Sequence, residues 1–328
     1  MFALGITIGA AVTYVGNFNP KPGKEITNNI YPIRTNERNF TFINPLLSYE
    51  LPSGITLGEY SPLSDKIKTL IQEFKSINPD TSVSVYFQNL NNGRRIGIDE
   101  DKKYTPASLM KVIVLIAYFR KARIEPAILD QDIFYKEEIQ KLSHTIPYDP
   151  GTKLVLNEPY KIDDLIERMI TQSDNGATYA LLHEVDRNIL AQVYEDLHID
   201  APPEEGRAFT ISVSDYALLF RVLYNATYVN RVMSERALEL LSRTEYKDGI
   251  TGPLDPEIQV AHKYGEAVTE VNGSIAHELH DCGIIYYPDK PYILCVMTSG
   301  QNTLHLTSLV QQISKAVYED IKNNEYPD

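Results

Sequence analysis

The segment Val112–Phe119 reads VIVLIAYF and is apolar on every side, which limits the folds open to this chain. A helix without a polar face is buried all round, so the rest of the chain has to surround it. The neighbouring residues, about 106–240, show helical hydrophobic spacing at Ile162–Ile170, Ala177–Val185 and Asp215–Leu223. We therefore expect a helical block with Val112–Phe119 at its centre.

Strand-like segments lie on both sides of this block, at Ser82–Leu90, Arg94–Ile98, Gly283–Tyr287 and Tyr292–Met297. Amphipathic helices are expected over Ser61–Ile77 and Leu304–Ile321, where apolar residues recur at helical spacing. This order predicts an α+β fold of the α/β sandwich type. An antiparallel sheet of about five strands, formed from both chain ends and flanked by helices, would carry an inserted all-helical lobe.

The expected domain organisation follows from composition. Residues 1–16 are apolar and nearly uncharged, too short to span a bilayer, and typical of a signal or membrane-anchor remnant; a buried strand or helix is the alternative. Residues 17–61 are rich in Asn, Pro, Gly and Ser, as in a linker. Residues 62–328 form one domain, with an α/β lobe (62–105 and 258–328) and a helical lobe (106–257). We expect an exported, extracytoplasmic or cell-envelope protein.

Charge and cysteine content exclude several classes of function. The chain has 31 Lys and Arg against 44 Asp and Glu, a formal charge of −13. Such a chain repels phosphate backbones and anionic lipids, so we expect no nucleic-acid partner and membrane contact only through the N-terminal segment. Two cysteines are too few for a disulfide scaffold or a Cys-type metal site. We expect no metal, no cofactor and a monomer.

Ser108 and Lys111 form an S-x-x-K pair at the start of the apolar helix, after Pro106. Residues three apart share a helix face, so the Lys111 amine can approach the Ser108 hydroxyl. A serine needs a base to become a nucleophile, and lysine serves when burial or a nearby cation lowers its pKa. A lysine leading into so apolar a helix is uncommon for structural reasons alone.

Two further short motifs carry polar groups. Ser173-Asp174-Asn175 can supply a proton relay and an amide that binds substrate, although Ser, Asp and Asn are also common helix caps. Lys263-Tyr264-Gly265 places an ammonium beside a strand glycine, which allows close approach of an extended substrate. An exposed strand lysine beside a turn glycine is the alternative.

In this order, S-x-x-K, S-D-N and K-x-G resemble the motifs of the active-site-serine superfamily of class A β-lactamases and penicillin-binding proteins. The resemblance covers roughly residues 63–323. It implies that Ser108 is acylated, Lys111 is its proton partner, Ser173 relays a proton, Asn175 binds a substrate amide and Lys263 binds a carboxylate. It further implies an oxyanion hole from the amides of Ser108 and Glu266, and a structural role for Asp174.

The sequence departs from the family pattern in two places. Tyr264 stands where the family has a Thr or Ser hydroxyl, and a phenol is too bulky to occupy the same spot. The loop before the helix near Ser212 lacks the family's E-x-x-L-N pattern. Glu204 and Glu205 are weak candidates for the base that activates the deacylating water. Without such a base the acyl-enzyme would turn over slowly.

Three functions remain open after this comparison. They are a serine hydrolase that opens β-lactam amides, a peptidoglycan D,D-peptidase, and a catalytically weak module that binds cell-wall peptide. The substrate is accordingly a small β-lactam or a cell-wall peptide.

Two other groups of residues have weaker interpretations. His277 and His280 are one residue short of H-E-x-x-H and are not expected to share a metal. Cys282 and Cys295 flank a hairpin signal and are expected to face each other, either bridged or as buried thiols.

Overall fold

The computed structural model describes residues 31–34, 40–50, 61–143, 152–202, 209–271 and 274–323. Its main sheet has five antiparallel strands in the order β4-β3-β11-β10-β9. These strands are β3 (Ser82–Asn89), β4 (Arg95–Ile98), β9 (Val260–Val271), β10 (Ser274–Ile285) and β11 (Tyr292–Gly300). Because β3 lies beside β11 although they are far apart in sequence, the predicted sheet from both chain ends is confirmed.

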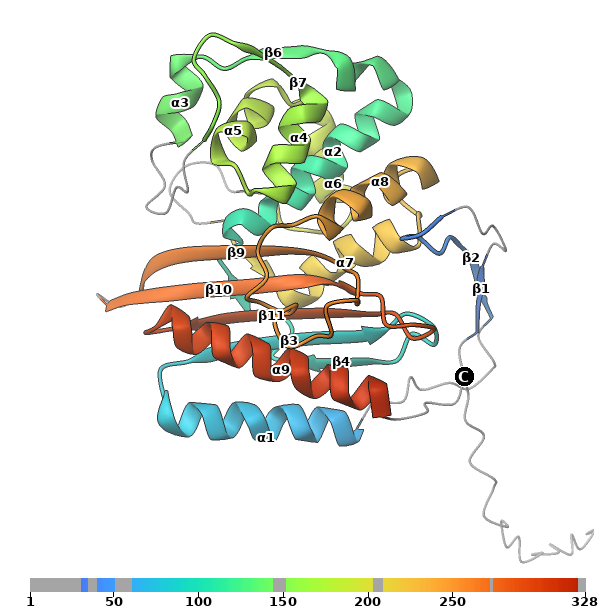
Figure 1. The fold of residues 1–328 in the computed structure, drawn as a ribbon, viewed down its shortest axis with the longest axis vertical. Coiled ribbons are helices and arrows are strands. Elements are labelled where there is room, and N and C mark those ends of the chain that lie inside the picture. Colours follow the sequence, from blue (N-terminus) through green and yellow to red (C-terminus); the bar gives the residue numbers. More distant parts are fainter. Residues whose placement is uncertain are drawn as a thin grey trace, which may run out of the picture.

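Two long helices cover one face of this sheet (Figure 1). They are α1 (Ser61–Ile77) and α9 (Thr303–Asn323), from the two ends of the domain. Ile67 of α1 and Ile313 of α9 are buried against Phe87 and Val296 of the sheet. Their apolar stripes recur every three or four residues, so each helix can bury one side while the other stays in water.

The opposite face of the sheet carries the inserted lobe (Figure 1). The lobe contains α2 (Lys111–Ile124), α3 (Glu137–Ser143), α4 (Ile162–Thr171), α5 (Asn175–Glu184), α6 (Arg187–Asp196), α7 (Val213–Tyr224) and α8 (Arg231–Ser242), with short turns η1 (Ala107–Met110) and η2 (Pro126–Asp130). Helix α7 packs on the sheet, and every residue of α2 up to Phe119 is buried. The apolar segment is therefore the centre of the lobe, as its sequence predicts.

The lobe also contains short strands, so the expectation of an all-helical lobe is corrected. Within the lobe, strand β6 (Asp132–Phe134) pairs with β7 (Pro159–Lys161). Strand β8 (Ile211–Ser212) of the lobe pairs with β5 (Lys103–Tyr104), which lies just before the lobe in the chain. Only the middle residue of β6 is buried. Two or three residues are too few to show the alternation by which a strand is recognised in sequence.

Part of the predicted linker over residues 17–61 is docked on the domain. Strands β1 (Tyr31–Arg34) and β2 (Leu46–Glu50) pair with each other, and Phe42 and Ile43 between them are each only 6% exposed. The backbone amides of both residues donate to Glu235 at 2.9 Å. A free tether is therefore the wrong description for residues 40–46, because this apolar pair has a binding surface on α8.

The N-terminal segment 1–16, predicted as a signal or anchor remnant, lies outside the described residues. Within the ranges described above, no helix has the length and apolarity that crossing a membrane requires.

Cys282 and Cys295 lie directly opposite each other on β10 and β11, which confirms that they face across the hairpin. Both are buried, free thiols. Burial raises the pKa of each thiol, so these side chains behave as small apolar groups in the core.

Candidate active site

Ser108 lies on the short turn η1, immediately before the helix that begins at Lys111. Residues i and i+3 of a 3₁₀ turn lie above one another, and Ser108 and Lys111 line the same pocket. Ala107 has a φ of +48°, in the left-handed region that non-glycine residues seldom adopt. The strained turn is held by its neighbours: Tyr216 donates a hydrogen bond to the Leu109 carbonyl at 3.0 Å.

Gly265 allows the edge strand β9 to approach this turn closely. A Cβ atom at position 265 would lie 2.9 Å from the Pro106 carbonyl oxygen and 3.2 Å from the Leu109 amide nitrogen. Any larger residue would push the strand and the turn apart. Glycine is thus required here by contact between two backbones, which places Ser108 and Glu266 on the same pocket.

The residues leading into η1 are anchored by a pair that sequence reasoning did not assign. The Thr105 amide donates to Glu278 at 3.1 Å, and His280 Nε2 lies 3.1 Å from the Thr105 carbonyl oxygen. The Thr298 amide donates to Nδ1 of His280, so Nε2 carries the proton and donates to Thr105. The sequence shows Glu278 and His280 only as part of a failed metal motif.

Lys111 is the hub of the polar network. Its Nζ donates to the Ser173 carbonyl oxygen at 2.5 Å, to Ser173 Oγ at 3.0 Å and to Asn175 Oδ1 at 2.8 Å. The lysine is 2% exposed. A buried ammonium needs such partners, so the network fixes how Ser173 and Asn175 lie relative to the helix that begins at Lys111.

Lys263 approaches the same serine from the strand. Its Nζ lies 3.0 Å from Ser173 Oγ, and the side chain is fully buried. Burial, and secondly the positive charge of Lys111, lower the pKa of Lys263 well below its usual value, while Asp281 opposes the shift. Asp281 is itself buried and lies 2.8 Å from His262 Nδ1. This second buried pair carries no signal in the local sequence, because its members lie on different strands.

Asp174 caps helix α5, as the helix-cap interpretation of its motif predicts. Its carboxylate accepts from the Ala177 amide and from the Thr152 hydroxyl, both at 2.9 Å. Ser173 before it has a φ of +58°. The motif therefore combines a cap with two side chains that bind Lys111, and the cap sets their position.

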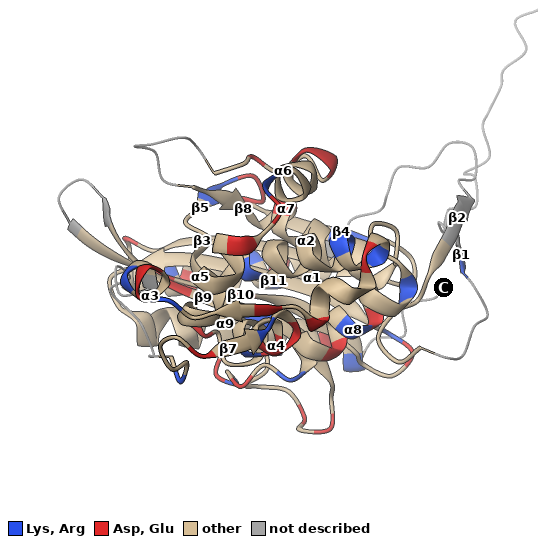
Figure 2. Ribbon diagram, turned by 90° about the horizontal axis from the view of Figure 1, so that it is seen from above, with Lys and Arg blue, Asp and Glu red and all other residues tan. Residues whose placement is uncertain are grey.

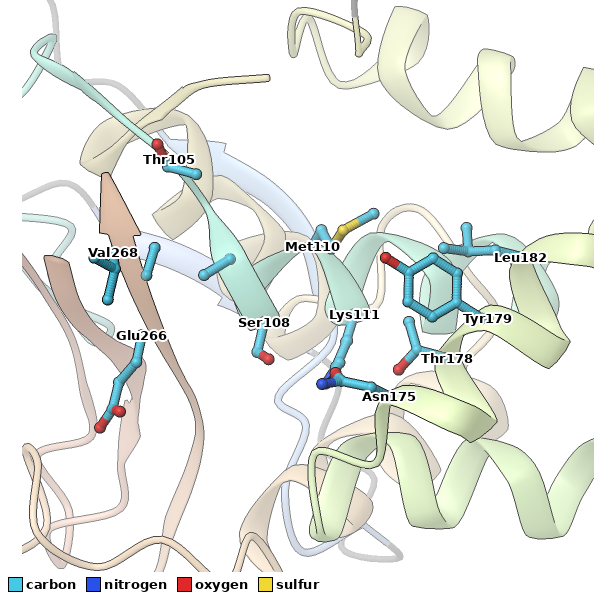
Figure 3. Close-up of a pocket in the computed structure, with 12 residues that line it drawn as sticks. Thr105, Ser108, Met110, Lys111, Asn175, Thr178, Tyr179, Leu182, Glu266 and Val268 are labelled. Carbon is cyan, nitrogen blue, oxygen red and sulfur yellow. The ribbon is translucent and has the colours of Figure 1, made fainter. Parts of the chain in front are cut away.

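A pocket of about 320 Å³ opens beside Ser108. Figure 3 shows Glu266 and Val268 on its β9 side and Tyr179 and Leu182 on its helical side, with Ser108 and Lys111 between them. Apart from Ser108, Lys111, Asn175 and Glu266, the lining is largely apolar. Glu266 is its one carboxylate among the described residues, and burial raises the pKa of that carboxyl.

Tyr264 is held between two neighbours. Its ring stacks on Tyr246 with centroids 3.9 Å apart and planes 17° apart, and the Lys263 ammonium lies 4.4 Å from its ring centroid. Tyr246 precedes β9 and was not assigned from the sequence, since stacking partners distant in the chain leave no motif.

The structure thus gathers Ser108, Lys111, Ser173, Asn175 and Lys263 around one site. Tyr264, Gly265 and Glu266 lie along the strand at its edge.

The two weak candidates for a deacylation base, Glu204 and Glu205, lie outside the described residues. Among the described side chains, no cluster of His, Cys, Asp or Glu suits a metal ion.

The sequence profile of the β-lactamase enzyme family matches residues 62–321, most of the chain. The chain belongs to this family. It is a serine hydrolase of the β-lactamase type, and the resemblance inferred from its three motifs is confirmed. A comparison with curated proteins gives no match.

Solved structures of β-lactamase-type proteins have the same fold. The acyl-enzyme complex of a PBP-A variant with penicillin G is 22% identical, with a TM-score of 0.68 over 82% of this chain and 100% of that one. A class A β-lactamase from Mycobacterium abscessus is 17% identical, with a TM-score of 0.65 over 79% and 99%. TLA-3 extended-spectrum β-lactamase is 18% identical, with a TM-score of 0.67 over 78% and 98%.

Proposed function

We propose that this β-lactamase-family protein opens β-lactam amides through an acyl-enzyme on Ser108 and hydrolyses that acyl-enzyme slowly. One observation carries the proposal: Ser173 Oγ lies 3.0 Å from the amines of both Lys111 and Lys263, beside the pocket that Ser108 lines. Two lysines on one hydroxyl provide a proton path between the nucleophile and a leaving group.

The acylation step requires the neutral form of Lys111, which has given one proton to solvent and therefore releases one of its three hydrogen bonds. This amine takes the proton of Ser108, and the serine oxygen bonds to the lactam carbonyl carbon. The amides of Ser108 and Glu266 stabilise the resulting oxyanion. The carbon–nitrogen bond then breaks, and Ser173 gives its proton to the leaving nitrogen. Lys111 returns a proton to Ser173, so every proton is accounted for.

Slow deacylation is proposed from the chemistry of the pocket lining. Hydrolysis of an ester needs a base that activates water. Glu266 is the lining carboxylate among the described residues, and it belongs to the β9 side (Figure 3). We do not assign it as the base, because Lys111 and Asn175 lie across the pocket from it. That no lining residue among those described is assigned as the base also favours a D,D-peptidase as the second candidate, since such an enzyme also forms a lasting adduct with penicillin.

Two similarities support this assignment. One solved structure of the same fold is an acyl-enzyme with penicillin G, and others are class A β-lactamases. The apolar N-terminal residues favour an exported, envelope-associated protein, which also fits a substrate found outside the cytoplasm.

Incubation with benzylpenicillin, followed by mass measurement of the intact protein over time, tests the proposal. We expect an adduct with the mass of the whole drug that persists for minutes in the wild type and is absent from Ser108→Ala. Rapid loss of drug without a lasting adduct would indicate an efficient β-lactamase instead. No adduct in the wild type would leave a binding module.

A further inference from the structure

The Tyr264 ring has close neighbours. Tyr246 stacks on it with centroids 3.9 Å apart, and the buried Lys263 Nζ lies 4.4 Å from the ring centroid. A short hydroxyl residue at this position of a K-x-G motif would leave its oxygen available to a substrate. Here the aromatic ring is partly buried and stacked on Tyr246, and it fills the position that a short hydroxyl side chain would leave open.

The Tyr264 hydroxyl is committed to Ser173. A serine hydroxyl has two lone pairs and one hydrogen, and Lys111 and Lys263 use the lone pairs. Before substrate binds, the remaining hydrogen is directed to the Tyr264 oxygen, and it has to turn from there to the leaving nitrogen in the proposed acylation step. Burial raises the pKa of Tyr264, and this hydrogen bond from Ser173 opposes the shift.

Apart from Lys263, the charged groups that act on the two stacked tyrosines are acidic. Tyr264 lies in the field of Glu266, Asp281 and Glu245. Tyr246 lies in the field of Asp281, Glu266 and Asp248. Because carboxylates lie near both tyrosine rings, this edge of β9 is unfavourable for an anion.

The neighbouring strand brings one group that can carry positive charge, His277, which lies opposite Val268 and opposes the raised pKa of Glu266. It lies two residues beyond Glu266 and farther still from Tyr264 along the strand. In the β10 register, Leu279 lies opposite Glu266 and Asp281 lies opposite Tyr264. Lys263 is fully buried and already bonded to Ser173 Oγ and the Tyr264 carbonyl oxygen. A carboxylate placed beside Tyr264 would meet Glu266 rather than a free ammonium.

We propose that this cleft selects acyl donors that carry no carboxylate beside the scissile bond, and that Tyr264 and Glu266 determine this specificity. The inference rests on the proposed acylation of Ser108. It assigns the substrate a neutral or cationic group where a penicillin carries its carboxylate. Glu266 lines the pocket directly, whereas Tyr264 acts by occupying the position and holding Ser173.

Benzylpenicillin and its methyl ester form a matched pair of probes, equal in acylating chemistry and different in one charge. Second-order rate constants for adduct formation, measured by intact-protein mass, give the preference of each variant. For the wild type we expect the ester to react at least as fast as the acid. A preference for the acid of about tenfold, worth about 1.4 kcal/mol, would overturn the inference.

Two substitutions should shift the preference toward the carboxylate. Tyr264→Thr restores a short hydroxyl, and Glu266→Gln removes the opposing charge while keeping the side-chain shape. We expect each to raise the ratio of acid to ester rates by about tenfold, as for one hydrogen bond to a charged group. An unchanged ratio in Glu266→Gln, which alters no packing, would contradict the inference even if Tyr264→Thr folds poorly.

Tyr264→Phe separates the hydroxyl from the ring. It keeps the stack on Tyr246 and removes the partner of Ser173, so both probes should slow equally and the pH profile of acylation should shift. Tyr286→Phe, which loses a 2.9 Å hydrogen bond to Phe42 at the far end of β10, is the matched control and should change neither. No Ser108 adduct with either probe would refute the proposed function itself, whereas an adduct from the acid alone would refute only this inference.

Discussion

The Ser173 hydroxyl is bonded to two buried lysines. Lys111 and Lys263 both lie 3.0 Å from its hydroxyl oxygen, and their mutual repulsion adds to the cost of burial. The pKa of Lys263 falls as a result, so a larger fraction of this amine is uncharged near neutral pH.

Lys263→Met should separate stability from activity. A lysine whose pKa is lower in the folded than in the unfolded state binds fewer protons when folded, so stability rises with pH between those two values. In the wild type this rise ends near the ordinary lysine value of about 10.4. We expect the rise to be smaller in Lys263→Met and acylation to fall by about 10²-fold.

Denaturant unfolding at neutral and alkaline pH, with adduct rates on the same samples, checks this prediction. Lys68→Met, on the exposed side of α1, is the control and should change neither quantity. If the unfolding free energy of Lys263→Met depended on pH as in the wild type, Lys263 would not be the residue whose lowered pKa causes that dependence.

Glu266 predicts a pH dependence of substrate choice. Burial raises the pKa of its carboxyl, with His277 on β10 opposing the shift, and Tyr264 and Tyr246 stay neutral in the range concerned. As the pH falls through this raised pKa, Glu266 loses its charge and repels a carboxylate less. The ratio of benzylpenicillin to methyl-ester acylation should therefore rise toward acid pH in the wild type. It should stay flat in Glu266→Gln, and a flat wild-type ratio would count against the role of Glu266.

At the scale of elements, the contact between β9 and η1 predicts a sharp effect of Gly265→Ala. The added methyl group meets backbone atoms of Pro106 and Leu109, which cannot turn away. We expect a loss of about 1–3 kcal/mol in unfolding free energy and at least tenfold slower acylation, because the turn that carries Ser108 has to move. Gly93→Ala is the control, since its φ of +73° makes it strained but nothing lies within 4 Å. It should lose stability without losing acylation, and equal acylation losses in both variants would indicate general destabilisation.

Helix α5 gives a second test at this scale. Asp174→Ala removes the cap that positions Ser173 and Asn175, so it should cost about 1 kcal/mol of stability and slow acylation as well. Asp186→Ala removes a comparable cap from α6, away from the network, and should cost only stability. Adduct rates and thermal unfolding of both variants decide whether this cap serves the site.

Helices whose apolar pattern continues over many residues could be predicted from the sequence. Contacts between elements could not. The sequence pattern of α1 predicts its bounds, Ser61–Ile77, and the apolar run identifies the central helix. Anchors such as Glu278 for Thr105, or Tyr246 for Tyr264, join residues whose approach depends on the finished fold. Strand pairs of two or three residues, as in β6, are too short for any pattern.

At the scale of the whole molecule, the charge of −13 opposes the approach of an anionic substrate. Acidic residues are distributed over the inserted lobe, for example along α4 and α6 (Figure 2). Salt screens such repulsion, with a Debye length of about 10 Å at 0.1 M. Acylation by benzylpenicillin should therefore become faster as salt is added, while acylation by the neutral methyl ester should not. Equal salt effects on both probes would point to a change in the protein rather than to screening.

The fold as a whole places three short motifs, each ambiguous alone, around one hydroxyl, and the family profile over residues 62–321 agrees with that arrangement. Peptide mapping of the penicillin adduct tests the central assignment most directly. After digestion, the mass of the drug should lie on the peptide that contains Ser108, and the peptide with Ser173 should be unmodified. A label on Ser173, or on any residue other than Ser108, would contradict the assignment of the nucleophile.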